Sequence, residues 1–166
     1  MPNIVRQWRT TNSQPTTSRD LPIRQVYAWL LTSDNHIVIV SKDGENWQLP
    51  GGKPADEEDA QQALSREVFE ETGLCIGVGI VNFFGEYIIE NSSTSPCLRY
   101  RQVRSWVDLG VGSSSLSMTV KQESTAQDPD DVIRHVKTIP VNEIGGAIPW
   151  ILESDEYKSL IRTKVI

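Results

Sequence analysis

One stretch of the chain constrains its fold and chemistry more than any other: GGKPADEEDAQQALSREVFEETGL, residues 51–74. After the glycine pair, the segment from about residue 57 to 72 lacks internal glycine or proline, which predicts a helix that ends at Gly73. This helix places Glu67, Glu70 and Glu71 on one turn, where like charges destabilise a helix by roughly 0.3 kcal/mol per pair. The three carboxylates therefore need either solvent around them or a counter-charge.

The position of these glutamates on the helix favours a counter-charge. At about 100° per residue, apolar side chains form one stripe that should pack on a sheet. The stripe consists of Ala60, Ala63, Leu64 and Val68. Glu67 and Glu71 project within it and Glu70 lies just beside it. Composition alone equally allows a solvated acidic surface, but burying unpaired carboxylates costs several kcal/mol, so the projection favours a hard cation such as Mg²⁺ or Mn²⁺.

The residues around the glutamates fit chemistry on a phosphate anhydride. Arg66 lies four residues before Glu70, close enough to pair with it and fix its orientation. Gly51 and Gly52 allow a ligand to approach the backbone closely, and Lys53 can reach a phosphate. A glycine-rich loop alone is weak evidence, but a following carboxylate cluster strengthens it.

The charge of the chain excludes several classes of function. The net charge is −6 and the isoelectric point is near 4.9, which argues against a general binder of nucleic acids or membrane surfaces. A phosphorylated substrate therefore needs a local source of positive charge. Two cysteines are too few for a disulfide framework, and neither a membrane-span pattern nor a signal peptide is found, so we expect a cytoplasmic protein.

The remaining sequence predicts a mixed α/β domain. Residues 1–20 are expected to form a mobile or extended N-terminal arm, and residues 21–166 a single domain. Segments rich in β-branched and aromatic residues predict strands, a long loop at 110–131 and a final amphipathic helix at 148–166. The predicted strands cover residues 23–32, 36–41, 75–90, 98–109 and 132–139, and the first two are expected to form a hairpin.

The spacing in the opening stretch resembles the Nudix hydrolase family. Gly52, Glu58, the Arg66-Glu67-Val68 triplet, the Glu70-Glu71 pair and the final Gly73-Leu74 fill every defined position of the pattern GX5EX7REUXEEXGU, in which U is a bulky aliphatic residue. The resemblance implies an α/β/α sandwich around a central mixed β-sheet.

The resemblance also implies an activity and a role for each residue. Nudix proteins are mostly hydrolases of a nucleoside diphosphate linked to another moiety, and they work with Mg²⁺ or Mn²⁺. By this likeness Glu67, Glu70 and Glu71 are metal ligands, Arg66 orients them and Glu58 assists. Gly51, Gly52 and Lys53 shape the loop that faces the diphosphate.

The mechanism implied is in-line attack of a metal-activated water on a phosphorus of the anhydride. One of the glutamates, or an acidic residue of a later loop, accepts the proton. The later candidates are Glu123, Asp128, Asp130 and Asp131, of which Asp130 or Asp131 is slightly favoured. For each of these four, a solvated loop position is the commoner explanation.

The substrate is a small nucleotide on this interpretation, either a nucleoside triphosphate or a nucleoside diphosphate derivative. Two alternatives stay open: hydrolysis of a 5′-terminal phosphate anhydride on RNA, which the acidic composition disfavours, and a non-catalytic nucleotide-binding regulatory module. No membrane partner is expected, and a homodimer is an analogy with the family. Six aromatic residues are candidates for base stacking, with packing roles favoured for each: Trp29, Trp47, Tyr87, Tyr100, Trp106 and Trp150.

Overall fold

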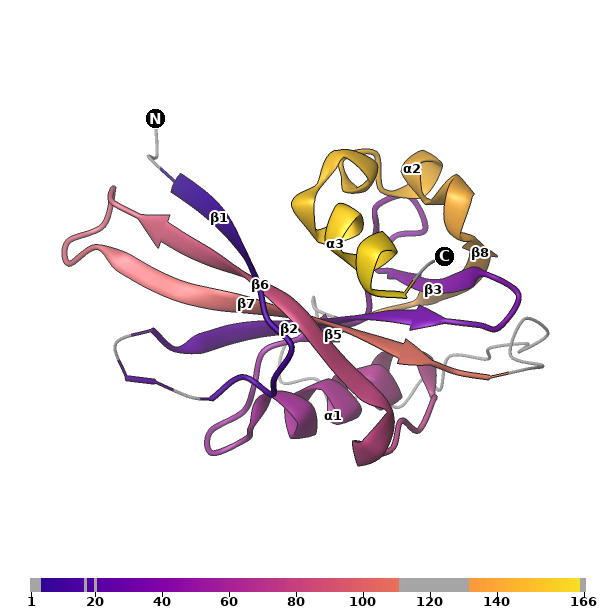
Figure 1. Cartoon of the computed structure of the whole chain (residues 1–166), viewed down its shortest axis with the longest axis horizontal. Coiled ribbons are helices and arrows are strands. Elements are labelled where there is room, and N and C mark those ends of the chain that lie inside the picture. Colours follow the sequence, from indigo (N-terminus) through magenta and orange to yellow (C-terminus); the bar gives the residue numbers. More distant parts are fainter. Residues whose placement is uncertain (1–3, 17, 20, 111–131, 165–166) are drawn as a thin grey trace.

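The computed structural model describes residues 4–16, 18–19, 21–110 and 132–164 (Figure 1). Within these residues one eight-stranded mixed sheet has the order β1-β6-β7-β2-β3-β4, with β5 paired to β2 and β8 paired to β3. The four later acidic candidates, Glu123, Asp128, Asp130 and Asp131, lie outside the described residues. The strands are β1 (Ile4–Thr10), β2 (Ile23–Leu31), β3 (His36–Ser41), β4 (Trp47–Gln48), β5 (Gly51–Gly52), β6 (Val81–Asn91), β7 (Leu98–Asp108) and β8 (His135–Pro140).

Helices cover both faces of the sheet. The helix α1 (Ala60–Thr72) lies on one face, and α2 (Ile144–Ala147) and α3 (Asp155–Lys164) lie on the other (Figure 1). Strand β2 is apolar along its buried half because both of its faces are covered. Ala28 and Leu30 join the core under α1, whereas Trp29 joins the core under α3. This layering confirms the predicted α/β/α sandwich around a mixed sheet.

Strands β2 and β3 diverge, and a short segment fills the space between them. They pair only at Leu30↔Val38 and Leu31↔Ile37, which confirms the predicted hairpin. Beyond this point β4 pairs with β3 and β5 pairs with β2, and the Ala28 amide donates to the Pro50 carbonyl at 3.0 Å. The chain segment that contains the glycine pair is thus held inside the sheet.

The predicted helix over residues 57–72 is present, but it begins later. Glu57 has a φ of 67°, which is not helical. Asp59 caps the helix because its side chain accepts from the Gln61 and Gln62 amides. The Asp59 amide in turn donates to Gln62 Oε1, which completes a capping box. Gly73 ends the helix with a φ of 74°.

Three other predicted elements have different bounds in the structure. The strand expected over 75–90 begins at Val81, because Val78–Ile80 forms a 3-10 turn. The strand expected over 132–139 runs from His135 to Pro140. The helix expected over 148–166 is divided at Ser154, whose hydroxyl caps α3 by accepting from the Tyr157 amide at 3.1 Å. No helix in the described part of the chain is long and apolar enough to cross a membrane.

The first strand of the chain joins the edge of the sheet. Strand β1 pairs antiparallel with β6 from Ile4↔Asn91 to Thr10↔Gly85. The Trp8 ring packs on the Tyr87 ring at 4.9 Å between centroids, and its Nε1 donates to Ser159 Oγ at 2.9 Å. Trp8 therefore links β1 to α3 within one chain.

A buried ion pair joins α3 to the sheet. The Glu156 side chain is fully buried and accepts from Arg104 Nε at 2.9 Å and from Trp29 Nε1 at 2.8 Å. A charge buried in this way stabilises the fold only while its partner is present.

Replacing Glu156 tests the contribution of this pair to stability. We expect Glu156→Gln to lower the free energy of unfolding by about 3 kcal/mol, because it leaves the Arg104 guanidinium buried without a carboxylate. Urea denaturation followed by tryptophan fluorescence measures the loss. Glu153→Gln is the matched control because Glu153 is exposed on the neighbouring 3-10 turn. Equal stability of the two variants would contradict the assigned role.

Candidate active site

The glycine strand β5 lies directly against the carboxylates of α1. The Gly51 amide donates to Glu71 Oε2 at 2.8 Å. A Cβ atom at position 52 would lie 2.5 Å from the Glu67 carboxylate, so only glycine leaves room for this side chain. At position 51 there is even less space for a side chain, because a Cβ would lie 2.0 Å from the Val26 carbonyl oxygen. The φ of +144° is also one that only glycine adopts readily. The two glycines therefore allow the backbone and the carboxylates to meet.

Arg66 gathers the acidic side chains of the loop and the helix. Its guanidinium contacts Glu58 Oε1 at 2.8 Å, Glu67 Oε1 at 3.0 Å and Glu70 Oε2 at 3.2 Å. It also donates to the second Glu58 oxygen and to the Lys53 carbonyl, both at 2.9 Å. One cation thus offsets the mutual repulsion of three carboxylates and ties the loop after β5 to the helix.

The environment changes the pKa of two of these carboxyl groups in opposite directions. Burial raises the pKa of Glu67 above its ordinary value of 4.5, and this effect outweighs the attraction of Arg66. The hydrogen bond from Arg66 lowers the pKa of Glu58, outweighing the opposing effect of desolvation. The negative charge of Glu67 is therefore less well compensated by the protein than that of Glu58.

The donor set fits a divalent cation in its chemistry. Glu67, Glu70 and Glu71 offer hard carboxylate oxygens, which Mg²⁺ and Mn²⁺ prefer. The negative charge of Glu67 is buried and only partly offset by Arg66, and Gly52 has no side chain beside it. Both features favour a cation close to this carboxylate. In the conformation seen, however, no three acidic, histidine or cysteine side chains of the described residues converge as a metal-holding group. Instead, Arg66 Nη1 lies between Glu67 and Glu70 and donates to a carboxylate oxygen of each.

The structure brings together five of the six side chains that the sequence assigned to the acidic helix and the loop before it. Glu58, Arg66, Glu67 and Glu70 form one connected cluster, and Glu71 joins it through Gly51. The exception is Lys53, whose carbonyl binds Arg66 while its side chain is exposed. Neither that carbonyl nor the Tyr27 ring, which would lie 2.9 Å from a Cβ at position 51, could be predicted from the sequence.

Two of the aromatic candidates and two arginines outside this cluster have packing or pairing roles in the structure. Trp29 is fully buried in the core under α3. Arg101 and Arg104 are buried and bind Glu86 and Glu156. Trp150 is exposed, and the Trp47 ring is covered by the Lys137 ammonium at 3.8 Å from its centroid.

Comparison with known proteins gives one family and a set of similar folds. A model of the NUDIX domain matches residues 21–160. The Bacillus subtilis pyrophosphohydrolase BsRppH has a TM-score of 0.56 and 14% identity, covering 95% of this chain and 91% of that one. A NUDIX hydrolase from Nitrosomonas europaea has a TM-score of 0.50 and 20% identity, covering 76% of this chain and 78% of that one. These two likenesses concern the fold, and no curated protein matches the chain.

Alanine substitutions at the glycines separate backbone strain from contact with the glutamates. Gly51→Ala combines an unfavourable φ with backbone overlap, so we expect a loss of more than about 3 kcal/mol in the free energy of unfolding. Gly73→Ala is the control for φ alone, since its φ is +74° and no atom lies within 4 Å of its Cβ position; about 1 kcal/mol is expected. Gly52→Ala should cost less than Gly51→Ala because the flexible Glu67 side chain can move. Chemical denaturation measures all three, and a Gly51→Ala variant as stable as Gly73→Ala would contradict this geometry.

The Glu58–Arg66 pair predicts a pH-dependent contribution to stability. Because folding lowers the pKa of Glu58 below 4.5, the stabilisation is complete above the pKa of the unfolded chain and is lost as the pH falls through the lower pKa of the folded chain. We expect Glu58→Gln to be about 1 kcal/mol less stable than the wild type near neutral pH, a value reduced by partial solvent exposure. The difference should narrow below pH 4.5. Urea denaturation of both proteins over a pH series measures it, and a difference independent of pH would exclude this explanation.

Proposed function

Because the chain belongs to the Nudix family, whose hydrolases act on phosphoanhydrides, we propose that it is a Mg²⁺- or Mn²⁺-dependent hydrolase of a small nucleotide. The substrate is a nucleoside triphosphate or a nucleoside diphosphate linked to another moiety. One observation carries this proposal: Arg66 and the Gly51 amide hold the three helix glutamates next to the backbone of the glycine strand β5, which carries no side chains.

Each residue of the cluster has a separate task in this reaction. Glu67, Glu70 and Glu71 would hold the cation, which supplies positive charge to the diphosphate and activates the attacking water. Arg66 orients Glu67 and Glu70, and the Gly51 amide fixes Glu71. Glu58 holds Arg66 from the opposite side through both of its oxygens.

The remaining steps also fall to groups of this chain. The side-chain-free backbone at Gly51 and Gly52 gives the diphosphate space next to the carboxylates. A carboxylate of the cluster accepts the proton of the water as it attacks phosphorus in line with the leaving group. Lys53 follows the glycine pair, and its exposed side chain would bring positive charge to the diphosphate.

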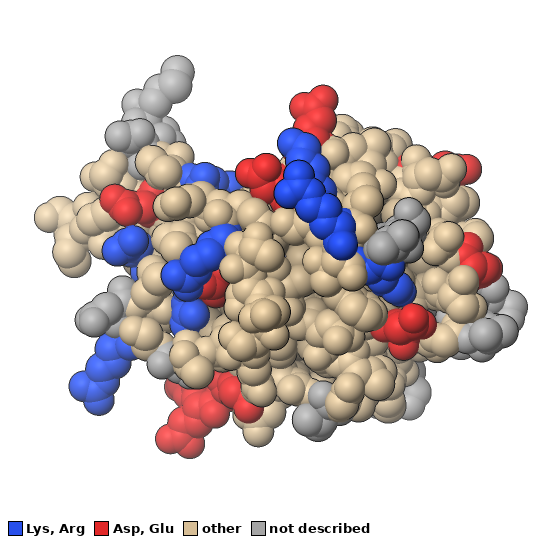
Figure 2. All heavy atoms as spheres, in the orientation of Figure 1, with Lys and Arg blue, Asp and Glu red and all other residues tan. Residues whose placement is uncertain are grey.

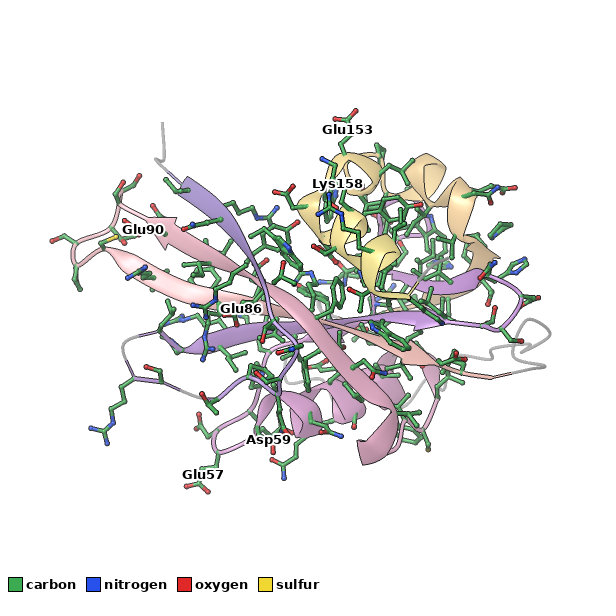
Figure 3. All side chains as sticks on the ribbon, in the orientation of Figure 1. Glu57, Asp59, Glu86, Glu90, Glu153 and Lys158 are labelled. Atoms are coloured by element: carbon green, nitrogen blue, oxygen red, sulfur yellow. The ribbon has the colours of Figure 1, made fainter. Side chains whose placement is uncertain are left out.

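Hydrolysis by single-residue variants tests the assignment. Glu70→Gln and Glu71→Gln each remove one negative charge with little change in shape, so we expect kcat to fall by about a hundredfold or more with little loss of stability. Nucleoside triphosphates, nucleotide sugars and dinucleotides are supplied with Mg²⁺ or Mn²⁺, and products are separated by ion-exchange chromatography. Glu57→Gln is the matched control because Glu57 is exposed in the same loop and its side chain points away from the ribbon (Figure 3).

A second measurement examines the metal directly. Binding of Mn²⁺, followed by its paramagnetic resonance signal, should weaken in both variants and stay unchanged in Glu57→Gln. Full activity and unchanged Mn²⁺ binding in Glu70→Gln and Glu71→Gln would exclude the assigned ligands. A wild type that binds nucleotides but hydrolyses none of them would instead be a regulatory module.

A further inference from the structure

Strand β1 forms an open edge of the sheet. Among the described residues it pairs with β6 alone, and its residues are exposed except for the half-buried Trp8. Figure 1 shows β1 at the margin of the sheet, and Figure 2 shows the surface hollowed between this margin and α3. The strand precedes residues 21–160, which match the NUDIX domain, so this edge is supplied by the arm before that domain.

The direction of the backbone groups of β1 follows from its pairing with β6. The Thr11 amide donates to the Phe84 carbonyl at 3.1 Å, one step beyond the last paired residues, Thr10 and Gly85. Because the residues of an antiparallel strand alternate between its two sides, the odd residues of β1 bond to β6. The even residues therefore present their N–H and C=O groups at the free edge: Ile4, Arg6, Trp8 and Thr10.

This edge lacks the features by which proteins usually prevent strand pairing. Residues 4–10 contain no proline or lysine, and they pair with β6 in one continuous register. The two arginines of the strand, Arg6 and Arg9, contact side chains of β6 instead of projecting across the edge. Ile4 and Val5 are 55% and 54% exposed. An edge of this kind favours pairing with another strand.

A second copy of the chain fits this edge through a two-fold axis. Because hydrogen-bonded pairs must join two outward-facing residues, even residues pair with even residues, and the axis passes through a residue and not between two. An axis through Arg6 or Arg9 places like charges opposite each other. An axis through Val5 or Trp8 leaves part of β1 unpaired. An axis through Gln7 pairs the whole strand without opposing like charges.

The register centred on Gln7 is also favoured by charge. It places Val5 opposite Arg9 of the second copy, and Val5 is itself the register partner of Glu90 on β6. Since neighbouring strands lie about 5 Å apart, the Cα atoms of Arg9 and Glu90 would be about 10 Å apart, within reach of these two long side chains. The side chains are 55% and 46% exposed. The two-fold axis forms this contact twice.

We propose that the chain forms a homodimer by antiparallel pairing of β1 with β1 of a second copy, centred on Gln7. The pair makes one continuous sheet in which every outward N–H and C=O of β1 has a partner. It also reduces the exposure of Ile4 and Val5. Two strands, β6 and β7, separate β1 from β2, so the acidic cluster beside β5 lies outside this interface. The inference is therefore independent of the proposed hydrolysis.

Cysteine cross-linking tests the register. The Cα atoms of a non-hydrogen-bonded pair lie about 4.5 Å apart, within the range of a disulfide, so Gln7→Cys should form a linked dimer under mild oxidation. Both natural cysteines are exposed and are replaced by serine in every variant. Val5→Cys is the matched control, because two copies of residue 5 would lie about 13 Å apart. Non-reducing electrophoresis should show linkage about tenfold faster at position 7, and equal rates or no linkage would overturn the register.

A charge variant tests the interface without cross-linking. In Val5→Lys the new side chain faces Glu90 of its own chain, which suits the monomer, but in the dimer it lies opposite Arg9 of the second copy. Sedimentation velocity over a concentration series should show a monomer–dimer equilibrium for the wild type, with a dimer Kd raised about tenfold by Val5→Lys. Ile80→Lys is the matched control, because Ile80 is exposed outside β1. A wild type that stays monomeric, or a dimer that Val5→Lys leaves intact, overturns the proposal.

Discussion

The absence of side chains at Gly51 and Gly52 is the constraint on which the rest of the site depends. Glu67 occupies the space that a Cβ at position 52 would take, and Glu71 binds the Gly51 amide. The strand pairs with β2 at the same time, so the glycine backbone connects the centre of the sheet to the helix that carries the acids. A Cβ at position 51 would overlap the Val26 carbonyl oxygen, and one at position 52 would displace the Glu67 carboxylate.

Charge compensation explains why the fold tolerates so many acids in one place. Arg66 neutralises part of the cluster and leaves Glu67 with a raised pKa, because its burial is not fully offset. A metal cation held by Glu67, Glu70 and Glu71, as proposed, would complete the compensation. The same protein places Arg104 against Glu156 in a drier environment, where the pair joins α3 to the sheet. Arginine thus has a structural role on one face and an organising role on the other.

The first hairpin and the acidic helix could be predicted from local sequence pattern, whereas the α/β/α sandwich was implied by the resemblance to the Nudix family. The start of the helix differed because the capping box at Asp59 overrides helix propensity at Glu57. The break at Ser154 follows from a hydroxyl cap that periodicity does not reveal. Arg104 could not be assigned from the sequence, since its partner Glu156 lies on a different element far along the chain.

The two faces of β5 contact different layers of the molecule. Gly52 meets Glu67 on the α1 face, whereas Gly51 meets Tyr27 on the opposite face. Successive residues of a strand point to opposite sides, so a two-residue strand is enough to contact both layers. On the α1 face the absence of a side chain at Gly52 leaves room for the Glu67 carboxylate. On the other face the Tyr27 ring stacks with the guanidinium of Arg104, which binds Glu156 of α3, so the same short strand joins the acidic helix to the layer that α3 anchors.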